Sequence, residues 1–198
     1  MRALTHFVRW SLGLAPPDTQ TTAAERDCLA RHATGRRRLV EIGVFEGVTT
    51  IRLREAMAAD GLLLAVDPYP VGRLGVSLQR RIARTEVARV RNGRVRWVRT
   101  TGAEAAARHA ASGEPPVDLV FIDGDHRFEV IRADWEGWSP FVVPGGVVAL
   151  HDSRSTDDRP IHDAGSVRFT EEVVLKDPRF AVIETEETLT VLERRPGR

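Results

Sequence analysis

The sequence is short of several residue types, and each shortage excludes a class of protein. Its one cysteine, Cys28, excludes an internal disulfide and is typical of a reducing cytosol, so we expect a cytoplasmic protein. No apolar run approaches the roughly 18 residues that a membrane-spanning helix needs, so we expect no membrane span. The apolar N-terminal stretch is interrupted by His6 and Arg9, and no small-residue cleavage site follows it. It predicts a short amphipathic helix ended by Pro16 and Pro17, not a signal peptide.

An excess of charge of one sign is also missing. The chain has 29 basic and 28 acidic residues and a net charge of +1 at pH 7, so the molecule as a whole does not attract polyanions. Between Arg73 and Arg99, nine arginines accompany one acid, Glu86. These arginines alternate with apolar positions, and Trp97 is the one aromatic residue of the segment. Such a pattern is typical of solvated helix and strand faces, so we expect no nucleic-acid partner.

The chain instead shows a regular alternation of helical and strand patterns. Thr22, followed by Glu25 three residues later, forms a capping-box signature at the start of one helix. The strand patterns are RRRLVEIGVFEG, with Arg36 to Arg38 outside the strand, LLLAVDPYP, GRVRWVRTTG, PPVDLVFIDGDH and GGVVALHDS. The helical patterns between them are VTTIRLREAMAADG, which stops at Gly61, SLQRRIARTEVARV, AEAAARHAA and EVIRADWEGWSPFV. A helix near RFTEEVVLKD and two strands, FAVIET and LTVLERR, follow.

This order predicts the fold class. A chain of 198 residues suits one domain. We expect an α/β fold with a Rossmann-like, doubly wound, mostly parallel seven-stranded sheet that ends in an antiparallel C-terminal hairpin. Ligands of such sheets bind beyond the carboxyl ends of the strands, near the topological switch point. The strand ends of this chain, GVFEG, DPYP, TTGAE, DGDH and HDS, place its polar and glycine-rich residues at that edge.

The first two strand ends indicate a nucleoside-containing ligand. Gly43 permits a tight turn, and Gly47 allows the next helix N-terminus to approach a ligand closely. Asp67 ends the second strand and is placed to accept hydrogen bonds from both hydroxyls of a ribose. The glycine spacing differs from the dinucleotide fingerprint Gly-x-Gly-x-x-Gly, and Glu41 would repel a pyrophosphate. We therefore favour a cationic ligand such as S-adenosylmethionine over the alternative that Glu41 is a buried acid paired with an arginine.

Several segments, in this order, resemble a known family. LVEIGVFEGVTT, LLAVDPYP and VDLVFIDGDHRFEVIRADWEGWSPFVVPGGVVALHDS resemble class I S-adenosylmethionine-dependent methyltransferases. More narrowly, they resemble small bacterial O-methyltransferases related to macrocin O-methyltransferase. The resemblance covers Thr22 to Arg195, and IDGDH and PGG…HD are its most specific parts. It implies S-adenosyl-L-methionine as cofactor and a homodimer. It also implies a set of cofactor-binding residues: Glu41, Gly43 and Gly47 at the methionine part, Asp67 at the ribose, Gly102 and Ala103 at the adenine, and Asp123 beside the donor.

The fourth and fifth strand ends carry the residues for catalysis that the resemblance implies. Asp123, His151 and Asp152 match the positions at which metal-dependent relatives hold a divalent ion. His151 stands where an Asp or Glu is expected, which leaves open whether the ion is Mg²⁺, Mn²⁺, Zn²⁺ or Co²⁺, or is absent. His151 could equally be a second base or a structural hydrogen-bonding group. His126, three residues after Asp123, matches the general base of sugar-modifying relatives. For Asp125 we favour a cap on the following helix.

These features together predict one methyltransferase domain over residues 1–198. Residues 1–35 would form N-terminal helices that contribute to the acceptor pocket, and residues 36–198 the Rossmann-like core. The polar loops PYPVGRLGVSLQ and SRSTDDRPIHDAG are typical of a lid over a polar acceptor, and the aromatic content of 6% favours a saccharide hydroxyl over a phenol. The alternatives are a phenolic natural product, RNA, or a non-catalytic cofactor-binding domain. Trp135 and Trp138 are expected in the core.

Overall fold

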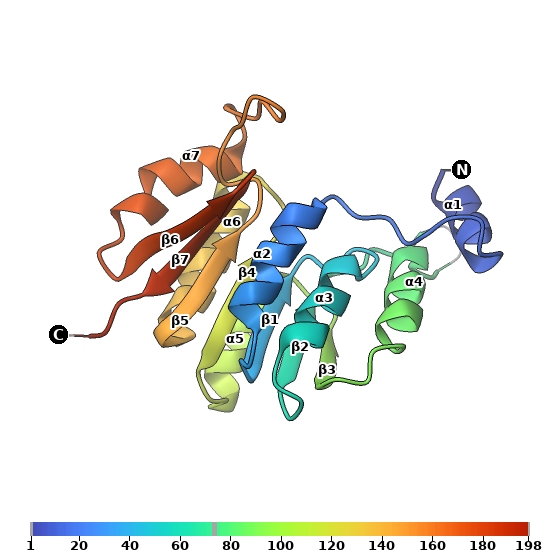
Figure 1. Cartoon of the computed structure of the whole chain (residues 1–198), viewed down its shortest axis with the longest axis horizontal. Coiled ribbons are helices and arrows are strands. Elements are labelled where there is room, and N and C mark those ends of the chain that lie inside the picture. The colour runs from blue at the N-terminus through green and yellow to red at the C-terminus, as the bar shows by residue number, and fades with distance from the viewer. Residues whose placement is uncertain (1, 73–74, 198) are drawn as a thin grey trace.

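A seven-stranded sheet forms the centre of the molecule. The computed structural model describes residues 2–72 and 75–197. The sheet has the strand order β3-β2-β1-β4-β5-β7-β6 (Figure 1). The strands are β1 (Arg38–Ile42), β2 (Leu62–Val66), β3 (Arg94–Val98), β4 (Val117–Ile122), β5 (Val142–Leu150), β6 (Phe180–Glu186) and β7 (Leu189–Arg194). The first five strands pair in parallel, whereas β7 is antiparallel to both β5 and β6, which confirms the predicted fold class.

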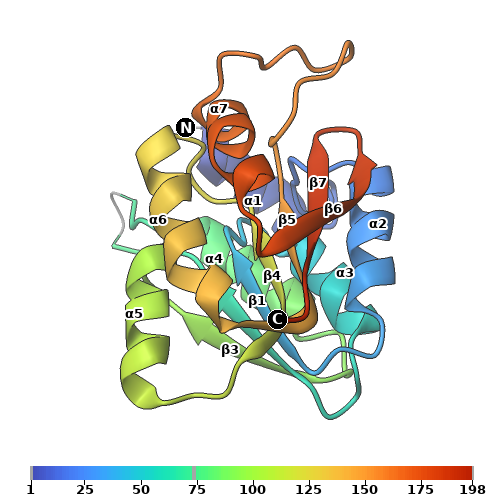
Figure 2. The ribbon, with the colours of Figure 1, turned by 90° about the vertical axis from the view of Figure 1, so that its left-hand side faces the viewer.

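Helices cover both faces of this sheet (Figures 1 and 2). They are α1 (Arg2–Ser11), α2 (Ala23–Ala33), α3 (Val48–Ala56), α4 (Leu78–Val87), α5 (Gly102–Ser112), α6 (Phe128–Trp138) and α7 (Gly165–Glu172), with short 3₁₀ turns at Ser139–Phe141 and Val174–Lys176. Residues of α2 and α3 pack on one face, and residues of α5, α6 and α7 pack on the other. The strand order changes direction between β1 and β4, so the switch point lies at the centre of the sheet.

The buried strands explain why the core forms on both sides. Consecutive residues of β1 and β4 are almost all buried, as expected for a parallel sheet covered on both faces. Trp135 and Trp138 are 2% and 1% exposed and belong to the core, as predicted. Cys28 is a buried free thiol on α2.

Both predicted N-terminal helices form, but α1 ends at Ser11, before the predicted end at Pro16 and Pro17. The capping box of α2 is present, since Thr22 Oγ1 accepts from the Glu25 backbone N–H (3.2 Å) and Glu25 Oε2 accepts from the Thr22 N–H (2.9 Å). Helix α1 packs against α4, where Trp10 Nε1 donates to Glu86 Oε1 at 2.8 Å. No helix in the described part of the chain is long and apolar enough to cross a membrane.

Two further predicted boundaries are also wrong by a few residues. Arg38 lies inside β1, because its backbone pairs with Leu62 and the Asp118 carboxylate accepts from its N–H. Helix α3 ends at Ala56 and does not continue to Gly61, since Met57 has an extended backbone with ψ of 168°. A turn closed by the Gly61 N–H and the Ala58 carbonyl follows and leads into β2.

Candidate active site

A cavity of about 520 Å³ lies at the carboxyl ends of the parallel strands. Its lining comes from the loops after β1, β2, β3 and β4, from α6, and from Asp18, Thr19 and Gln20, which precede α2. The strand ends are expected here from the sequence, but the loop of Asp18 to Gln20 is not. That loop carries no motif of its own and reaches the site only through the fold.

Backbone contacts shape the loop after β1. Gly43 has a φ of 88°, and a Cβ on it would lie 2.0 Å from the Asp123 carbonyl oxygen, so only glycine lets the β1 and β4 loops meet. Gly47 also has a positive φ and precedes α3. A Cβ there would lie 2.9 Å from Val87 Cγ2, so the close approach that Gly47 permits is to α4.

Asp67 is held against the loop after β1. Its Oδ2 accepts from the Val44 and Phe45 N–H groups at 3.0 and 3.1 Å, and its Oδ1 accepts from the Tyr69 N–H at 2.7 Å. A carboxylate has about four acceptor positions, so one remains for a ligand hydroxyl. Asp67 lines the cavity.

Glu41 lies outside the cavity lining. Its side chain is wholly buried, and Thr50 Oγ1 donates to its Oε2 at 2.6 Å. Burial raises the pKa of Glu41 well above its ordinary value, and the nearby Asp123 and Asp67 add to this effect. The other oxygen, Oε1, has no hydrogen-bond partner among the described residues. Neither the arginine partner nor the direct cavity position that we considered for Glu41 is present in the described structure.

A buried acid that the sequence analysis missed closes the far end of the cavity. Asp134 on α6 is 2% exposed and accepts from the Ala103 backbone N–H, and burial raises its pKa to about 6. A Cβ on Gly102 would lie 2.3 Å from Asp134 Oδ1, so glycine is required for this approach. Gly102 lines the cavity, whereas Ala103 does not. Asp134 shares the helical spacing of Ile131, Trp135 and Trp138, and an acid on such an apolar face is a signal that the sequence contains.

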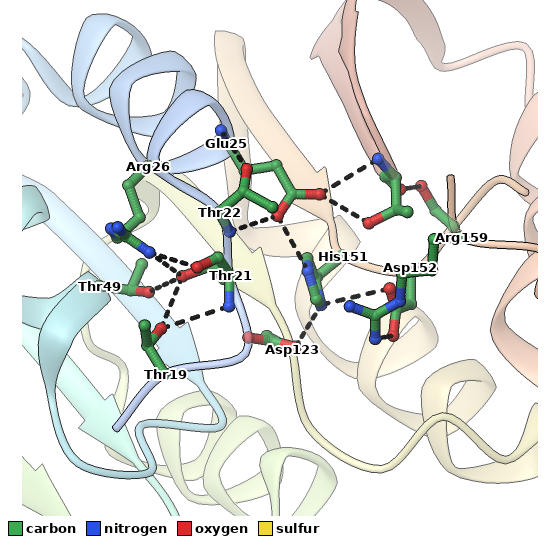
Figure 3. A network of polar contacts seen from close by, with 12 residues as sticks. Thr19, Thr21, Thr22, Glu25, Arg26, Thr49, Asp123, His151, Asp152 and Arg159 are labelled. Atoms are coloured by element: carbon green, nitrogen blue, oxygen red, sulfur yellow. Dashed lines mark hydrogen bonds and ion pairs between the residues drawn. The ribbon is translucent and has the colours of Figure 1, made fainter. Parts of the chain in front are cut away.

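At the centre of the sheet edge, two histidines alternate with carboxylates. Asp123 follows β4, and His151 and Asp152 follow β5 (Figure 3). His151 Nδ1 lies 2.8 Å from Asp123 Oδ1. His126 lies between the two acids, with Nδ1 3.1 Å from Asp152 Oδ2 and Nε2 3.5 Å from Asp123 Oδ1. The structure therefore brings together His126, Asp123, His151 and Asp152, which the sequence analysis had proposed for catalysis and metal binding.

The carboxylates favour the charged form of both rings. Hydrogen bonding to Asp123 and then to Asp152 raises the pKa of His126 to about 9. Burial acts to lower the pKa of His151, but contacts with Asp123 and Glu25 override it and raise this pKa to about 10. Burial acts to raise the pKa of Asp152, but contact with His126 and the charges of His151 and Arg159 hold it below its ordinary value. When no ligand is bound, the carboxylates therefore favour a proton on each ring, which a bound cation would displace from His151 Nδ1.

Glu25 is the second acid that the sequence analysis missed as a site residue. It is 1% exposed, and its Oε2 lies 3.2 Å from His151 Nε2 (Figure 3). Its Oε1 accepts from the Thr188 N–H and hydroxyl at 3.1 and 2.6 Å. Burial opposes ionisation of Glu25, but the hydrogen bonds from His151, Thr188 and Thr22 lower its pKa to about 2. In the sequence, the capping box already accounts for Glu25, so its contact with His151 is not expected.

The donor set of this cluster fits a small cation. One ligand atom each of Asp123, His126 and His151 lie within 4.8 Å of one another. His151 Nδ1 and Asp152 Oδ1 are buried without a hydrogen-bond partner in the described part of the chain. Asp152 adopts a left-handed backbone with φ of 49°, is paired with Arg159, and its carbonyl accepts from Ser166 Oγ at 2.6 Å. Such strain at a non-glycine residue is typical of functional sites.

The predicted cap by Asp125 is wrong. Arg127 holds the N-cap position of α6 and has no side-chain capping bond. Asp125 instead closes the turn before the helix, since its Oδ1 accepts from the Arg127 N–H at 3.0 Å and its carboxylate pairs with the Arg127 guanidinium. This bidentate ion pair satisfies Asp125 outside the helix.

The central part of the chain matches a known protein family. The profile of a family described as "Methyltransferase domain" matches residues 40–153. A protein of Sinorhizobium fredii, described as uncharacterized protein y4gI, is 33% identical over 129 residues, or 62% of this chain. The chain matches 14% of the length of that relative.

Solved structures share the fold over nearly the whole chain. An O-methyltransferase from Bacillus cereus in complex with SAH has a TM-score of 0.65 and 19% identity, with 98% of this chain and 91% of that chain covered. The O-methyltransferase TomG from Streptomyces achromogenes, involved in tomaymycin synthesis and solved with SAM, has a TM-score of 0.63 and 22% identity. Here 99% of this chain and 91% of TomG are covered. At these identities the likeness shows a common fold.

Proposed function

Because the chain belongs to the methyltransferase-domain family, we propose that it transfers the methyl group of S-adenosylmethionine to a hydroxyl oxygen of a small molecule. The observation that carries this proposal is the cavity at the switch point, one wall of which is Asp123, the residue that also contacts His126 and His151. Similar folds named as O-methyltransferases and solved with SAM or SAH support both the donor and the reaction class.

The cavity offers a place for each part of the donor. The loop after β1 and the segment Asp18 to Gln20 would hold the methionine part, and Asp67 would accept from a ribose hydroxyl. Gly102 and Asp134 would face the adenine. When bound, S-adenosylmethionine supplies a methyl group on a positively charged sulfur. The carboxylate of Asp123, at the cavity wall, favours that charge.

His126 is the residue that would remove the proton from the acceptor hydroxyl. Its side chain is 28% exposed, so an acceptor can reach it, while Asp123 and Asp152 orient the ring from both sides. A base must be neutral before it accepts a proton, whereas the pKa of His126 is raised to about 9 in the ligand-free protein. A second positive charge beside the ring, from the donor or a metal ion, would lower this pKa toward the working range.

A divalent ion would be held by Asp123, His151 and Asp152, the set expected from the sequence, with His126 beside it. The two buried atoms without partners, His151 Nδ1 and Asp152 Oδ1, support this assignment. Mixed imidazole and carboxylate ligands favour Mn²⁺, Co²⁺ or Zn²⁺ over Mg²⁺. When bound, such an ion would lower the pKa of the acceptor hydroxyl.

A saccharide is the acceptor class that we propose. The aromatic content of the chain, 6%, gives a planar phenol little to stack on. The segment 154–164 projects beyond α7 and the C-terminal strands (Figure 2), where it could cover a polar acceptor. In the other loop proposed as a lid, residues 73–74 lie outside the described residues. Residues 1–35 would belong to the same domain as the core, since Glu25 reaches the site from α2. A homodimer and a cytoplasmic location stay predictions from the sequence.

A methyl-transfer screen tests this function. The purified chain is incubated with methyl-labelled S-adenosylmethionine and panels of saccharides, phenols, amines and RNA. Each panel is run with chelator and with added Mg²⁺, Mn²⁺ or Co²⁺. We expect label on a saccharide and faster transfer with Mn²⁺ or Co²⁺ than with chelator. If only phenols or RNA become labelled, the saccharide is not the acceptor. If the protein does not bind S-adenosylmethionine, the proposed function is wrong.

A further inference from the structure

We propose that Glu25 is a positioning residue that fixes the tautomer of His151, so that Nδ1 faces the cation site beside Asp123 and Asp152. This inference rests on the proposed function, because it concerns the ion assigned to that site. It adds a residue from the N-terminal helix α2 to the machinery at the carboxyl ends of β4 and β5. Figure 3 shows Glu25 extending from α2 to His151.

The surroundings of Glu25 make its carboxylate an acceptor on every side. Its Oε1 accepts from the Thr188 N–H and hydroxyl, and its Oε2 accepts from the Thr22 N–H. A carboxyl group that accepts three hydrogen bonds has no reason to hold a proton of its own. At the remaining contact, 3.2 Å from Glu25 Oε2, His151 Nε2 is therefore the donor.

A proton on Nε2 leaves the lone pair of the neutral ring on Nδ1. This nitrogen lies 2.8 Å from Asp123 Oδ1 and 3.8 Å from Asp152 Oδ1, yet it has no hydrogen-bond partner of good geometry among the described residues. In the neutral ring this lone pair and the Asp123 oxygen repel each other unless a positive charge, either a proton or a metal ion, lies between them. A carboxylate that orients a ligating histidine from behind is the usual support for such a site.

Glu25 also connects segments that are far apart in the sequence. It belongs to the first turn of α2, Thr188 lies in the turn between β6 and β7, and His151 follows β5. All the groups in contact are buried, since Glu25, Thr188 and His151 are 1%, 2% and 0% exposed. Glu25 thus fixes the Nε2 side of the His151 ring. Only the Nδ1 side can exchange a proton for a metal ion.

The variant Glu25→Gln tests this role. A glutamine that still accepts from Thr188 would turn its amide N–H₂ toward His151 Nε2, which would then have to be the acceptor, and would lose the hydrogen bond from the Thr22 N–H. The proton moves to Nδ1, which can no longer bind a metal. We expect the affinity for Mn²⁺, measured by electron paramagnetic resonance titration, to fall by about 10- to 100-fold.

Asp27→Asn is the matched control, because Asp27 lies on the same helix but pairs with Arg52 at the surface. It should bind Mn²⁺ as the wild type does. Thermal unfolding checks that both variants fold. Should Glu25→Gln not fold, ¹⁵N NMR of the Zn²⁺-loaded wild type gives the answer, with a proton expected on His151 Nε2. Equal Mn²⁺ affinity in wild type and Glu25→Gln, or a proton on Nδ1, would overturn the inference.

Binding of S-adenosylhomocysteine, measured by calorimetry on the same samples, separates this inference from the proposed function. A wild type that binds S-adenosylhomocysteine but not Mn²⁺ leaves methyl transfer in place and overturns the role of Glu25. A wild type that binds neither overturns both.

A different observation supports a second site, a hollow of about 380 Å³ beside α4. Four arginines line it, and no acid is among its lining residues: Arg80, Arg81, Arg84 and Arg99, with Ser77 and Thr85. Many other arginines of the chain form ion pairs, but none of these four has a carboxylate partner in the described ranges. We propose that this hollow binds a phosphate or pyrophosphate group of a small molecule.

Three of the four arginines of the hollow are held in place by neutral groups. Arg81 lies over the ring of Phe7 and Arg84 over that of Trp97, with 5.8 and 5.9 Å between each guanidinium carbon and the ring centre. Arg99 donates to the carbonyls of Pro68 and Tyr69 at 3.2 and 3.0 Å. Stacked and anchored guanidinium groups keep their charge unpaired and are well suited to bind a phosphate. Trp97 is partly buried and does not offer a row of aromatic rings, which argues against RNA.

Calorimetry with inorganic pyrophosphate tests this site. We expect millimolar or tighter binding to the wild type and at least a tenfold loss in Arg84→Gln, while Arg108→Gln on α5 serves as the control and binds normally. A generic RNA oligonucleotide is titrated in parallel at two salt concentrations. No pyrophosphate binding, equal binding by Arg84→Gln, or an RNA affinity that exceeds that for pyrophosphate and falls steeply with salt would each overturn the proposal.

Discussion

The two ends of the site are built in different ways. At the end formed by the donor cavity, neighbouring atoms approach Gly43 and Gly102 so closely that an added Cβ would collide with them. At the other end, which lies beyond the Asp123 wall of the cavity, His126 and His151 lie within about 3 Å of carboxylate oxygens. The first end depends on shape, and the second depends on electrostatics. We therefore expect substitutions at the first end to change folding and donor binding, and substitutions at the second to change reaction rate and metal binding.

Gly43→Ala should have the largest effect, because Gly43 joins the two ends. The new Cβ would lie 2.0 Å from a backbone oxygen of the β4 loop, and the φ of 88° is strained for any other residue. Overpacking and a left-handed backbone together cost about 2–5 kcal/mol. We expect a loss of that size in the free energy of unfolding, measured with urea, and loss of donor binding.

Gly13→Ala serves as the control for the backbone strain alone. Gly13 also has a positive φ, of 71°, but nothing lies within 4 Å of the position that a Cβ would take there. It should lose about 1–2 kcal/mol or less. Equal losses in Gly13→Ala and Gly43→Ala would show that the contact between the β1 and β4 loops contributes nothing.

His126→Ala tests the electrostatic end. Loss of a general base typically lowers the rate about 10²- to 10⁴-fold, whereas the donor cavity does not include His126. We expect kcat to fall within that range while the dissociation constant for S-adenosylhomocysteine stays the same. His162→Ala, in the exposed loop after β5, is the control and should keep full activity. Unchanged turnover in His126→Ala would rule out the proposed base.

The pH dependence sharpens the same comparison. The pKa of His126 is raised to about 9 by Asp123 and Asp152, and kcat/KM reports groups of the free protein. In metal-free protein, kcat/KM should therefore rise with pH to a midpoint near 9. Stability should change in the opposite direction, because a raised histidine pKa stabilises the fold fully below about pH 6.5 and the effect is lost through about pH 9. A kcat/KM profile that is flat from pH 6 to 9 would contradict the first trend, and a free energy of unfolding that does not fall over that range would contradict the second.

How much of this could be read from the sequence differs between the two ends. The strand ends carrying Asp67, Asp123 and His151 follow from the alternation of elements, because parallel strands place their carboxyl ends at one edge. Glu25 could be recognised as a cap, since capping depends on neighbours in the chain. Its contact with His151, 126 residues away, depends on how α2 packs, and no local pattern contains that information. Glu41 shows the converse: a local motif suggested a ligand contact, but its side chain turns toward Thr50.

Asp134→Asn should have the smallest effect, and its sign depends on pH. Burial raises the pKa of Asp134 to about 6, so ionisation costs folding free energy above that pH. Below about pH 4 the carboxyl group is protonated in both folded and unfolded states, and the substitution should be neutral. Between pH 4 and 6 the difference grows, and at pH 8 Asp134→Asn should be more stable than wild type by about 1–3 kcal/mol in urea unfolding. Asp134 also faces the proposed adenine position. If the donor affinity of Asp134→Asn changes over the same pH range as its stability, the charge of Asp134 also affects donor binding. A variant that is less stable than wild type at pH 8 would mean that the carboxylate form is stabilised by the N–H of Ala103 more than burial disfavours it.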